Sequence, residues 1–293
     1  MKKTLTVFTP TYNRAYCLQL GYEALKHQIS KDFKWLIIDD GSTDNTKALV
    51  DSWVEERFVD IEYHYKENGG MHTGHNKAYE LIDTELNVCI DSDDYMPENA
   101  VELIINKWNT VSNKSNIAGI IGLDAFKDGR TVGTQIPEYL EKGNLIDLYK
   151  KHRVKGDKKV VLQTELIKKY PCYPEYDNER LVPLGILYLM IGHDYDFVYD
   201  NSVYCIVEYL EDGSSKNILK QYMRSPRGFA YARKMQITYA NSCIEKFKNY
   251  IHLVSSALFA KDLSIAFYQT NPLLTTLALP FGLILNLYIR KYN

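Results

Sequence analysis

The chain of 293 residues lacks several features that define common protein classes. Its five cysteines are dispersed without CxxC spacing, which excludes a cysteine zinc site and favours reduced thiols in a cytosolic compartment. There is no excess of lysine and arginine, and the formal charge of −2 argues against a dedicated nucleic-acid-binding protein. The apolar stretch from Leu5 to Thr9 stops at Pro10 and is too short for a signal peptide. We therefore expect a cytoplasmic protein that does not bind nucleic acid.

Internal repeats and linker-like low-complexity segments are also missing from the sequence. The length fits one large domain, or one domain with an appendage. Lys216 to Tyr250 contains eight cations and one acid. This basic run is either a solvated helix face or a surface facing anionic lipid or a phosphorylated substrate.

A second unusual segment is the strongly apolar stretch Pro272 to Ile289, which contains Pro280 and is followed by Arg290-Lys291. Its length is at or below what a bilayer-spanning helix needs. A helix broken at Pro280 fits an interfacial membrane segment. The alternative is a hydrophobic helix that packs on the protein's own surface.

Short apolar runs alternate with helix-period stretches through the first 125 residues. The predicted strands are 5–8, 35–38, 61–65, 86–90 and 117–123, and the predicted helices are 18–28, 45–56, 75–82 and 98–109. Continuous apolar runs are typical of strands buried on both faces of a parallel sheet. The pattern predicts a Rossmann-like α/β fold with a mostly parallel central sheet and helices on both faces. Further along we expect a polar loop at 155–159, an edge strand at 160–162 and long helices from 216.

Four polar motifs follow one another in the first third of the chain. They are Pro10-Thr11-Tyr12-Asn13-Arg14, Asp39-Asp40-Gly41-Ser42-Thr43-Asp44, Asn68-Gly69-Gly70 and Asp91-Ser92-Asp93-Asp94. Three of them come directly after predicted strands, and ligands of doubly wound sheets bind beyond the carboxyl ends of the strands. Acidic residues gathered at one edge repel one another, so they indicate a cationic or hydroxyl-rich ligand.

The last motif holds two carboxylates separated by one residue, a spacing that can bind a hard divalent cation. The alternative is an acidic turn that caps the helix beginning near Pro97. In the third motif, glycines allow the backbone to approach a ligand closely, and the following helix N-terminus suits phosphate. His72 and His75 could line such a pocket; as a metal pair they lack a third ligand at helical spacing.

The order of these motifs and their residue types resemble those of the family-2 glycosyltransferases. These are nucleotide-sugar-dependent enzymes with a single GT-A catalytic domain. The resemblance covers residues 4–125 well and 150–215 more loosely. It implies an inverting, metal-dependent transferase that moves a sugar from a UDP-sugar to a hydroxyl of a glycan or lipid-linked glycan in polysaccharide biosynthesis. We expect a catalytic domain at 1–215 and a C-terminal helical extension at 216–293. Lipid-linked acceptors would suit peripheral contact with the inner face of the cell membrane.

The resemblance also assigns roles to individual residues. It implies that Asp93 binds Mn²⁺ or Mg²⁺, that Asp91 binds the ribose or a metal-bound water, and that Asp94 is a competing metal ligand. It makes Asp40 the acceptor of the uracil imide hydrogen. The complete nucleotide-sugar-binding set implied is Pro10, Thr11, Tyr12, Arg14, Asp39, Asp40, Asn68, Gly70, His72, Asn76, Asp91 and Ser92.

An inverting transfer needs a base that deprotonates the acceptor hydroxyl. The resemblance points to Tyr176-Asp177-Asn178-Glu179-Arg180, which lacks the family's Glu-Asp pair. Glu179 is the first choice and Asp177 the reserve, and a helix-capping acid is the alternative. His193-Asp194 is a weaker candidate, and Asp212-Gly213-Ser214-Ser215 resembles a family loop that folds over the sugar.

Other function classes fit less well. A sugar-phosphate nucleotidyltransferase would carry a glycine- and arginine-rich loop after the first strand, and a phosphohydrolase with an aspartyl nucleophile would carry its DxD motif there. A non-catalytic module that binds nucleotide sugars or glycans is compatible with the weak base motif, although not with an intact metal-binding motif.

Overall fold

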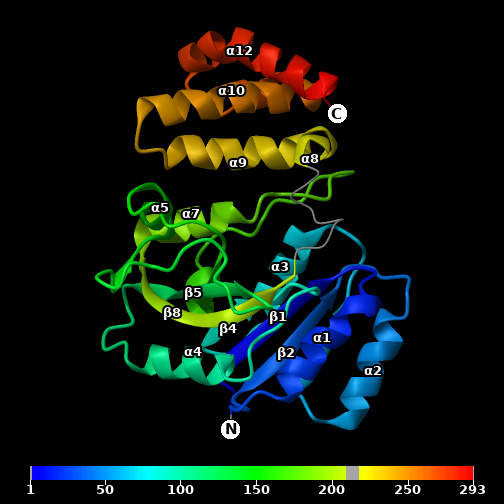
Figure 1. Cartoon of the computed structure of the whole chain (residues 1–293). Coiled ribbons are helices and arrows are strands. Elements are labelled where there is room, and N and C mark those ends of the chain that lie inside the picture. Colours follow the sequence, from blue (N-terminus) through cyan, green and yellow to red (C-terminus); the bar gives the residue numbers. More distant parts are fainter. Residues whose placement is uncertain (1, 209–217, 293) are drawn as a thin grey trace. The chain divides into compact units, whose positions relative to one another are not determined.

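The computed structural model describes residues 2–208 and 218–292 (Figure 1). The chain divides into two compact units. Unit 1 comprises residues 1–171 and 191–209, and unit 2 comprises residues 172–190 and 210–293. Three sequence predictions lie outside the described residues: the domain boundary between 215 and 216, the start of the basic run at Lys216, and the loop 212–215.

Unit 1 is built around an eight-stranded mixed sheet with the order β3-β2-β1-β4-β7-β5-β8-β6. The strands are β1 (Leu5–Thr11), β2 (Phe33–Asp39), β3 (Ile61–Tyr65), β4 (Leu86–Cys89), β5 (Ile117–Phe126), β6 (Lys142–Gly143), β7 (Lys158–Gln163) and β8 (Asp196–Val207). The first four pair in parallel, and so do β5 and β8. β7 runs antiparallel to β4 and β5, and β6 runs antiparallel to β8.

Helices cover both faces of this sheet, as predicted. They are α1 (Ala15–Lys26), α2 (Thr46–Glu56), α3 (Met71–Leu81), α4 (Ala100–Asn109), α5 (Leu145–Lys150) and α6 (Thr164–Ile167); α7 (Gly185–Asp194) has residues in both units. Because side chains alternate along a strand, Val7 packs into the core under α1, α2 and α4, whereas its neighbour Phe8 packs against α3. The predicted GT-A-like α/β architecture is confirmed.

Two sequence predictions about the sheet were wrong. The predicted edge strand 160–162 is β7, an interior strand between β4 and β5. The predicted polar loop 155–159 ends early, because Lys158 and Lys159 belong to that strand and are largely buried. In addition, β8, the longest strand, was not predicted from the sequence. Antiparallel and long-range pairing depends on distant partners, so local periodicity does not reveal it.

Unit 2 contains the predicted C-terminal helices. They are α8 (Ile218–Arg224), α9 (Pro226–Thr238), α10 (Cys243–Phe259), α11 (Ser264–Phe267) and α12 (Pro272–Lys291). α10 packs against α9 and α12, so the three long helices form a stack (Figure 1). Its core is small and rich in alanine, with Tyr250, Leu253 and Val254 of α10 at the centre.

The apolar segment at the C-terminus is one continuous helix, which corrects the expected break at Pro280. A single proline removes one helical hydrogen bond, and close packing on α10 offsets that loss. A Cβ on Gly282 would lie 2.4 Å from the Val254 side chain, and the Asn286 amide donates to the Ser255 carbonyl at 3.2 Å. The helix is long and apolar enough to cross a membrane, yet one face is committed to α10.

Candidate active site

The carboxyl ends of three neighbouring parallel strands bring three of the four motifs together. Thr11 pairs with Asp39 across β1 and β2, and Phe8 pairs with Cys89 across β1 and β4. The motif that starts at Asp91 therefore follows β4 at the same edge. This convergence, which the sequence predicted, arises because parallel strands end on the same side of the sheet.

Asp39 builds the turn after β2. Its carboxylate accepts hydrogen bonds from the Ser42 amide at 2.7 Å and from the Tyr63 hydroxyl at 2.6 Å. The side chain is fully buried. Burial, reinforced by Asp39, raises the pKa of the Tyr63 hydroxyl. Both oxygens of Asp39 thus have partners within the protein, which makes it a support for the motif.

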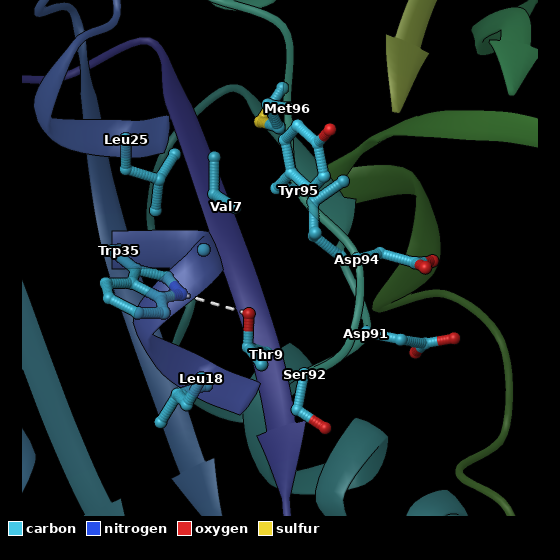
Figure 2. A pocket seen from close by; sticks show the side chains of 12 residues that line it. Val7, Thr9, Leu18, Leu25, Trp35, Asp91, Ser92, Asp94, Tyr95 and Met96 are labelled. Carbon is cyan, nitrogen blue, oxygen red and sulfur yellow. Dashed lines mark hydrogen bonds between the residues drawn. The ribbon is translucent and has the colours of Figure 1, made fainter. Parts of the chain in front are cut away.

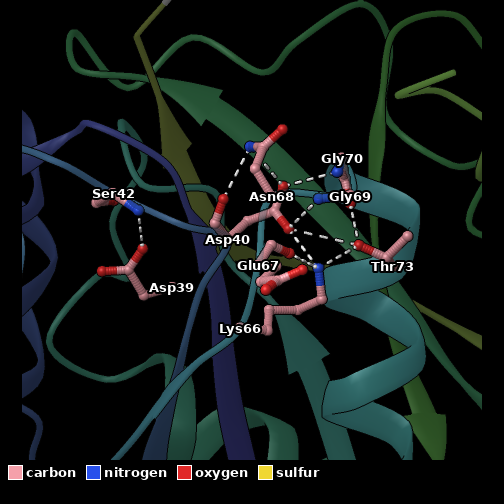
Figure 3. Close-up of polar contacts among 9 residues, drawn as sticks. All are labelled: Asp39, Asp40, Ser42, Lys66, Glu67, Asn68, Gly69, Gly70 and Thr73. Atoms are coloured by element: carbon pink, nitrogen blue, oxygen red, sulfur yellow. Dashed lines mark hydrogen bonds and ion pairs between the residues drawn. The ribbon is translucent and has the colours of Figure 1, made fainter. Parts of the chain in front are cut away.

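Asp40 connects the second motif to the third (Figure 3). The amides of Gly69 and Gly70 donate to its two carboxylate oxygens at 2.9 and 2.7 Å, and Lys66 forms an ion pair with it at 2.6 Å. The Asn68 amide donates to the Asp40 carbonyl at 2.8 Å. The carboxylate therefore fixes the backbone of residues 66–70. Its predicted contact with uracil stays a prediction, and any such contact must share oxygens that already accept several donors.

Glycine is required where these two loops meet. Gly41 has φ +90°, and a Cβ there would lie 2.8 Å from the Asn68 nitrogen. The two loops consequently approach each other more closely than residues with side chains would allow.

The first motif is tied to the second through Asn13, a residue that the sequence analysis did not single out. Its Oδ1 accepts from the Thr43 amide at 2.8 Å, and its own amide donates to Ser42 Oγ at 2.8 Å. Pro10 packs against Gly74 of α3, and Tyr12 is exposed. The Arg14 guanidinium hydrogen bonds to the Tyr16 hydroxyl. Thr11 Oγ1 is buried and has no hydrogen-bond partner among the described residues.

The third motif leads into α3, whose first turns are buried. His75 is only 2% exposed, and its ring packs edge-on against Phe8 with centroids 5.1 Å apart. Burial, with a smaller effect from His72, lowers the pKa of His75 to about 3. Among the described residues, no group of three or more His, Cys, Asp or Glu side chains could hold a metal ion. His72 and Asn76 also lie on this helix, and their predicted contacts with a ligand stay predictions.

The fourth motif forms a loop in which Asp94 is buried and Asp91 and Asp93 are half-buried. Figure 2 shows the Asp91 and Asp94 side chains extending to the same side of the loop. Burial raises the pKa of both carboxyls, that of Asp94 to about 7, against the opposing charge of Lys159. Behind the loop is a hollow of only about 10 Å³, lined by Thr9, Trp35 and Ser92 among others, which has room for about one water at most.

Two charged residues of this cluster were missed by the sequence analysis. Lys159 of β7 lies 3.8 Å from Asp124 of β5, measured from Nζ to Oδ1, and both side chains are buried. The only signal was a pair of lysines beside the apolar run Val160-Val161-Leu162, which we read as the end of a loop. The pair became visible only once β7 was placed between β4 and β5.

The predicted bases lie in unit 2. The Glu179 carboxylate accepts from the Arg227 and Gly228 amides at 3.0 and 2.9 Å and thereby caps the start of α9. This is the capping alternative that the sequence left open. Asp177 is exposed. The catalytic role of either residue stays a prediction. In unit 1, the exposed His193-Asp194 pair bonds internally at 2.9 Å.

Comparison with known sequences decides the family. Residues 6–164, more than half of the chain, match the sequence profile described as Glycosyl transferase family 2. The chain belongs to glycosyltransferase family 2. This family-2 chain is 27% identical to the poly(ribitol-phosphate) beta-N-acetylglucosaminyltransferase TarP of Staphylococcus aureus over 74% of its own length and 67% of TarP. It is 31% identical to a teichoic acid poly(glycerol phosphate) polymerase of Staphylococcus epidermidis over 110 residues, 36% of the chain but only 15% of that protein.

Solved structures of glycosyltransferases share the fold of this family-2 enzyme. Residues 1–349 of S. aureus TarS in complex with UDP-GlcNAc align with a TM-score of 0.62 at 17% identity, covering 95% of this chain and 80% of that one. The mannosyltransferase PcManGT from Pyrobaculum calidifontis, in complex with GDP-Man and Mn²⁺, aligns with a TM-score of 0.56 at 17% identity, covering 100% and 83%. These likenesses show the GT-A-like fold. The chain is a glycosyltransferase related to enzymes of teichoic acid and polysaccharide synthesis.

Proposed function

We propose that this enzyme transfers a sugar from a UDP-sugar to a hydroxyl of a glycan or lipid-linked glycan, with inversion and with the help of a divalent cation. The observation that carries the proposal is the meeting of the Asp40 loop and the Asp91–Asp94 loop at one sheet edge. Asp40 holds the Gly69 and Gly70 amides and so fixes the segment that leads into the N-terminus of α3, and the second loop presents carboxylates. A helix N-terminus suits a diphosphate, and carboxylates suit a cation that binds to it.

The names and titles of relatives support the substrate classes. TarP is named for N-acetylglucosamine transfer to poly(ribitol-phosphate), and the TarS structure contains UDP-GlcNAc. A Campylobacter jejuni relative, 27% identical over 36% of this chain, is named as a glucosyltransferase acting on a glycan linked to undecaprenol. We propose the same classes here: a UDP-sugar donor and an acceptor of a cell-surface polymer or its lipid-linked precursor.

The carboxylates of the fourth motif fit Mn²⁺ or Mg²⁺ by the chemistry of their donor atoms. Oxygen ligands suit both ions, and Asp91, Asp93 and Asp94 supply them. Since no preformed group of three such ligands exists among the described residues, further oxygens would come from the nucleotide diphosphate. When bound, such a cation neutralises the leaving diphosphate. We assign Asp93 and Asp94 to the cation, and Asp91 to the ribose or a cation-bound water.

The remaining roles follow from the contacts in each loop. We propose that Asp40, with Asn68 and Gly70, contacts the uridine side of the donor, and that the buried Thr11 hydroxyl and the exposed Tyr12 ring flank it. For the base we now favour Asp177, because both oxygens of Glu179 accept backbone amides of α9. A base must have an oxygen free to take the acceptor's proton.

We also propose that unit 2 contacts the membrane. The face of α12 opposite α10 exposes six large apolar side chains: Leu273, Leu277, Leu283, Ile284, Leu287 and Tyr288. Phe281 is also exposed in part, but its ring packs edge-on against Phe247 of α10. Arg290 and Lys291 end this helix, and Lys246 and Lys248 lie on α10. Apolar side chains flanked by cations suit the headgroup region of an anionic leaflet. Because the opposite face packs on α10, the helix would lie flat in the interface.

The decisive experiment measures UDP release from a panel of UDP-sugars by the full chain, with Mn²⁺ and with EDTA. We expect release from at least one UDP-sugar that depends on the cation, and stronger binding of UDP than of GDP in calorimetry. Equal rates in EDTA would remove the cation from the proposal. Absence of release from every UDP-sugar, with and without acceptor polymers, would remove the donor class.

A further inference from the structure

A buried lysine stands among the carboxylates of the candidate active site, and nothing in the motifs accounts for it. β7 runs antiparallel between β4 and β5, with Val161 paired to Val88 and Lys159 paired to Gly122. Lys159 therefore lies beside the point where β4 ends and the Asp91–Asp94 loop begins. The inserted antiparallel strand β7 therefore places the Lys159 ammonium at this position.

The contacts of Lys159 are electrostatic. Its Nζ lies 3.8 Å from Asp124 Oδ1, beyond hydrogen-bond distance, with the two side chains 13% and 4% exposed. Asp124 Oδ1 has no hydrogen-bond partner among the described residues. Lys159 also interacts through its charge with Asp91 and Asp94. The single ammonium of Lys159 thus offsets the negative charge of three carboxylates, those of Asp124, Asp91 and Asp94.

Charge in this cluster is unbalanced. Asp91, Asp94 and Asp124 are gathered around Lys159, Asp93 acts on Asp91 and Asp94, and the Arg14 guanidinium acts on Asp91 and Asp93 from the first loop. Buried carboxylates are costly unless a partner of opposite charge is near. Without Lys159, the cluster would lose the ammonium that acts on three of its carboxylates and would depend more strongly on a bound cation.

We propose that Lys159 is a positioning residue, a built-in counter-ion that holds the acidic cluster together and competes with the divalent cation for the same negative charge. The role rests on the proposed cation-dependent function. Its consequence is that a free cation binds weakly, because Lys159 repels it. Binding becomes tight when a nucleotide diphosphate adds its own oxygens and negative charge, so the cation and the nucleotide enter together.

The test is Mn²⁺ binding to the full chain by calorimetry, without and with UDP. We expect Lys159→Met to bind free Mn²⁺ at least about ten-fold more tightly than the wild type, since a unit charge several ångströms away is removed. Asp124→Asn should have the opposite effect, because it leaves Lys159 without its closest partner. The double variant should have an affinity for free Mn²⁺ closer to that of the wild type. Lys159→Arg keeps the charge and should bind free Mn²⁺ as the wild type does.

The neighbouring Lys158 provides a matched control. Its ammonium lies within hydrogen-bond distance of four backbone carbonyls, those of Val132, Lys155, Gly156 and Asp157, and its three N–H groups are shared among them. Lys158→Met should lower the melting temperature and change Mn²⁺ affinity far less than Lys159→Met, because the charge of Lys158 acts on Asp124 alone among the four acids. A purely structural role for Lys159 predicts the same behaviour for Lys159→Met, and that result overturns the proposal. If Lys159→Met does not fold, unchanged or tighter Mn²⁺ binding by Asp124→Asn overturns it.

The outcome also separates this role from the proposed function. If the wild-type enzyme needs Mn²⁺ but all variants bind Mn²⁺ equally well, only the proposed role of Lys159 is rejected. A wild type that transfers sugar without any divalent cation loses the cation-dependent function, and the role of Lys159 falls with it.

Discussion

The first 217 residues, which contain the sheet, and the helices from residue 218 onward are opposites in charge and in the placement of apolar side chains. Residues 1–217 hold 25 lysines and arginines against 35 aspartates and glutamates, a formal charge of −10. Residues 218–293 hold 10 against 2, a formal charge of +8. Apolar side chains of β1, β2 and β4 are buried on both sides of the sheet, whereas α12 exposes one complete apolar face.

This contrast shows that a nearly neutral chain can carry two different surfaces. The acids of the sheet unit that matter most are gathered at strand ends, where a cation and a diphosphate can be bound. The cations of α8 to α12 accompany an exposed apolar helix, a combination that attracts anionic lipid. An average charge of −2 conceals both, so each region must be tested separately.

The largest expected effect comes from the acidic region. Asp93→Ala should abolish sugar transfer, because it removes a carboxylate ligand of the cation that neutralises the leaving diphosphate. The measurement is UDP release with acceptor present. The control is Asp128→Ala, since Asp128 lies in an exposed turn and its side chain bonds to Arg130, away from the acidic cluster. Activity of Asp93→Ala within a few-fold of the wild type would contradict the assignment.

The second effect tests which acid of unit 2 takes part in chemistry. Asp177→Asn should lower turnover by about two to four orders of magnitude if Asp177 is the base. Glu179→Gln should instead lower stability by about 1 kcal/mol, because it weakens a helix cap, and should change turnover by only a few-fold. Turnover and melting temperature are measured for both variants. Crippled turnover in Glu179→Gln at an unchanged melting temperature would reverse the assignment.

The sequence predicted the parts of the molecule that local patterns specify. Continuous apolar runs located β1 to β5, and the polar motifs after three of these strands had to meet because parallel strands end at one edge. The seven-residue burial of β1 and of β2 shows why periodicity was sufficient there.

Contacts between distant residues could not be predicted in the same way. Glu179 caps a helix that starts 47 residues later, at Pro226, and no local pattern links the two. Lys159 meets Asp124 only because β7 is inserted antiparallel into the sheet. Asp40 looked like a ligand-binding residue, and its bonds to Gly69 and Gly70 became visible only when the loops were placed.

The third effect tests the membrane surface. Glutamate at Leu277 and Ile284, which are 53% and 65% exposed, should weaken binding to anionic vesicles by about 30- to 700-fold, since each side chain would otherwise bury apolar area worth about 1–2 kcal/mol. Flotation with vesicles of phosphatidylglycerol and phosphatidylcholine measures this. Leu20→Glu, at an exposed apolar position on α1, is the control. Equal flotation of the α12 variant, or of the wild type with and without vesicles, would leave α12 no membrane role.

The smallest effect distinguishes the two units by their stability in acid. Unfolded histidine has a pKa near 6.5, and burial lowers the pKa of His75 in unit 1 to about 3 and that of His252 in unit 2 to about 4. The unfolded chain therefore binds protons that the folded chain does not. Stability is complete above pH 6.5 and declines as the pH falls toward those lower values.

For His75 the decline should reach about 1 kcal/mol between pH 7 and pH 5.5. Urea unfolding can be followed in unit 1 alone, because all three tryptophans, Trp35, Trp53 and Trp108, lie there. His75→Gln should unfold at lower urea overall, since it loses packing against Phe8, but its unfolding free energy should depend less on pH in this window. His252→Gln should leave the pH dependence of the unfolding free energy measured from tryptophan unchanged. It should reduce only the pH dependence of the unfolding free energy measured from the helical signal. A His75→Gln variant that keeps the full wild-type dependence on pH would show that other groups govern the acid response of unit 1.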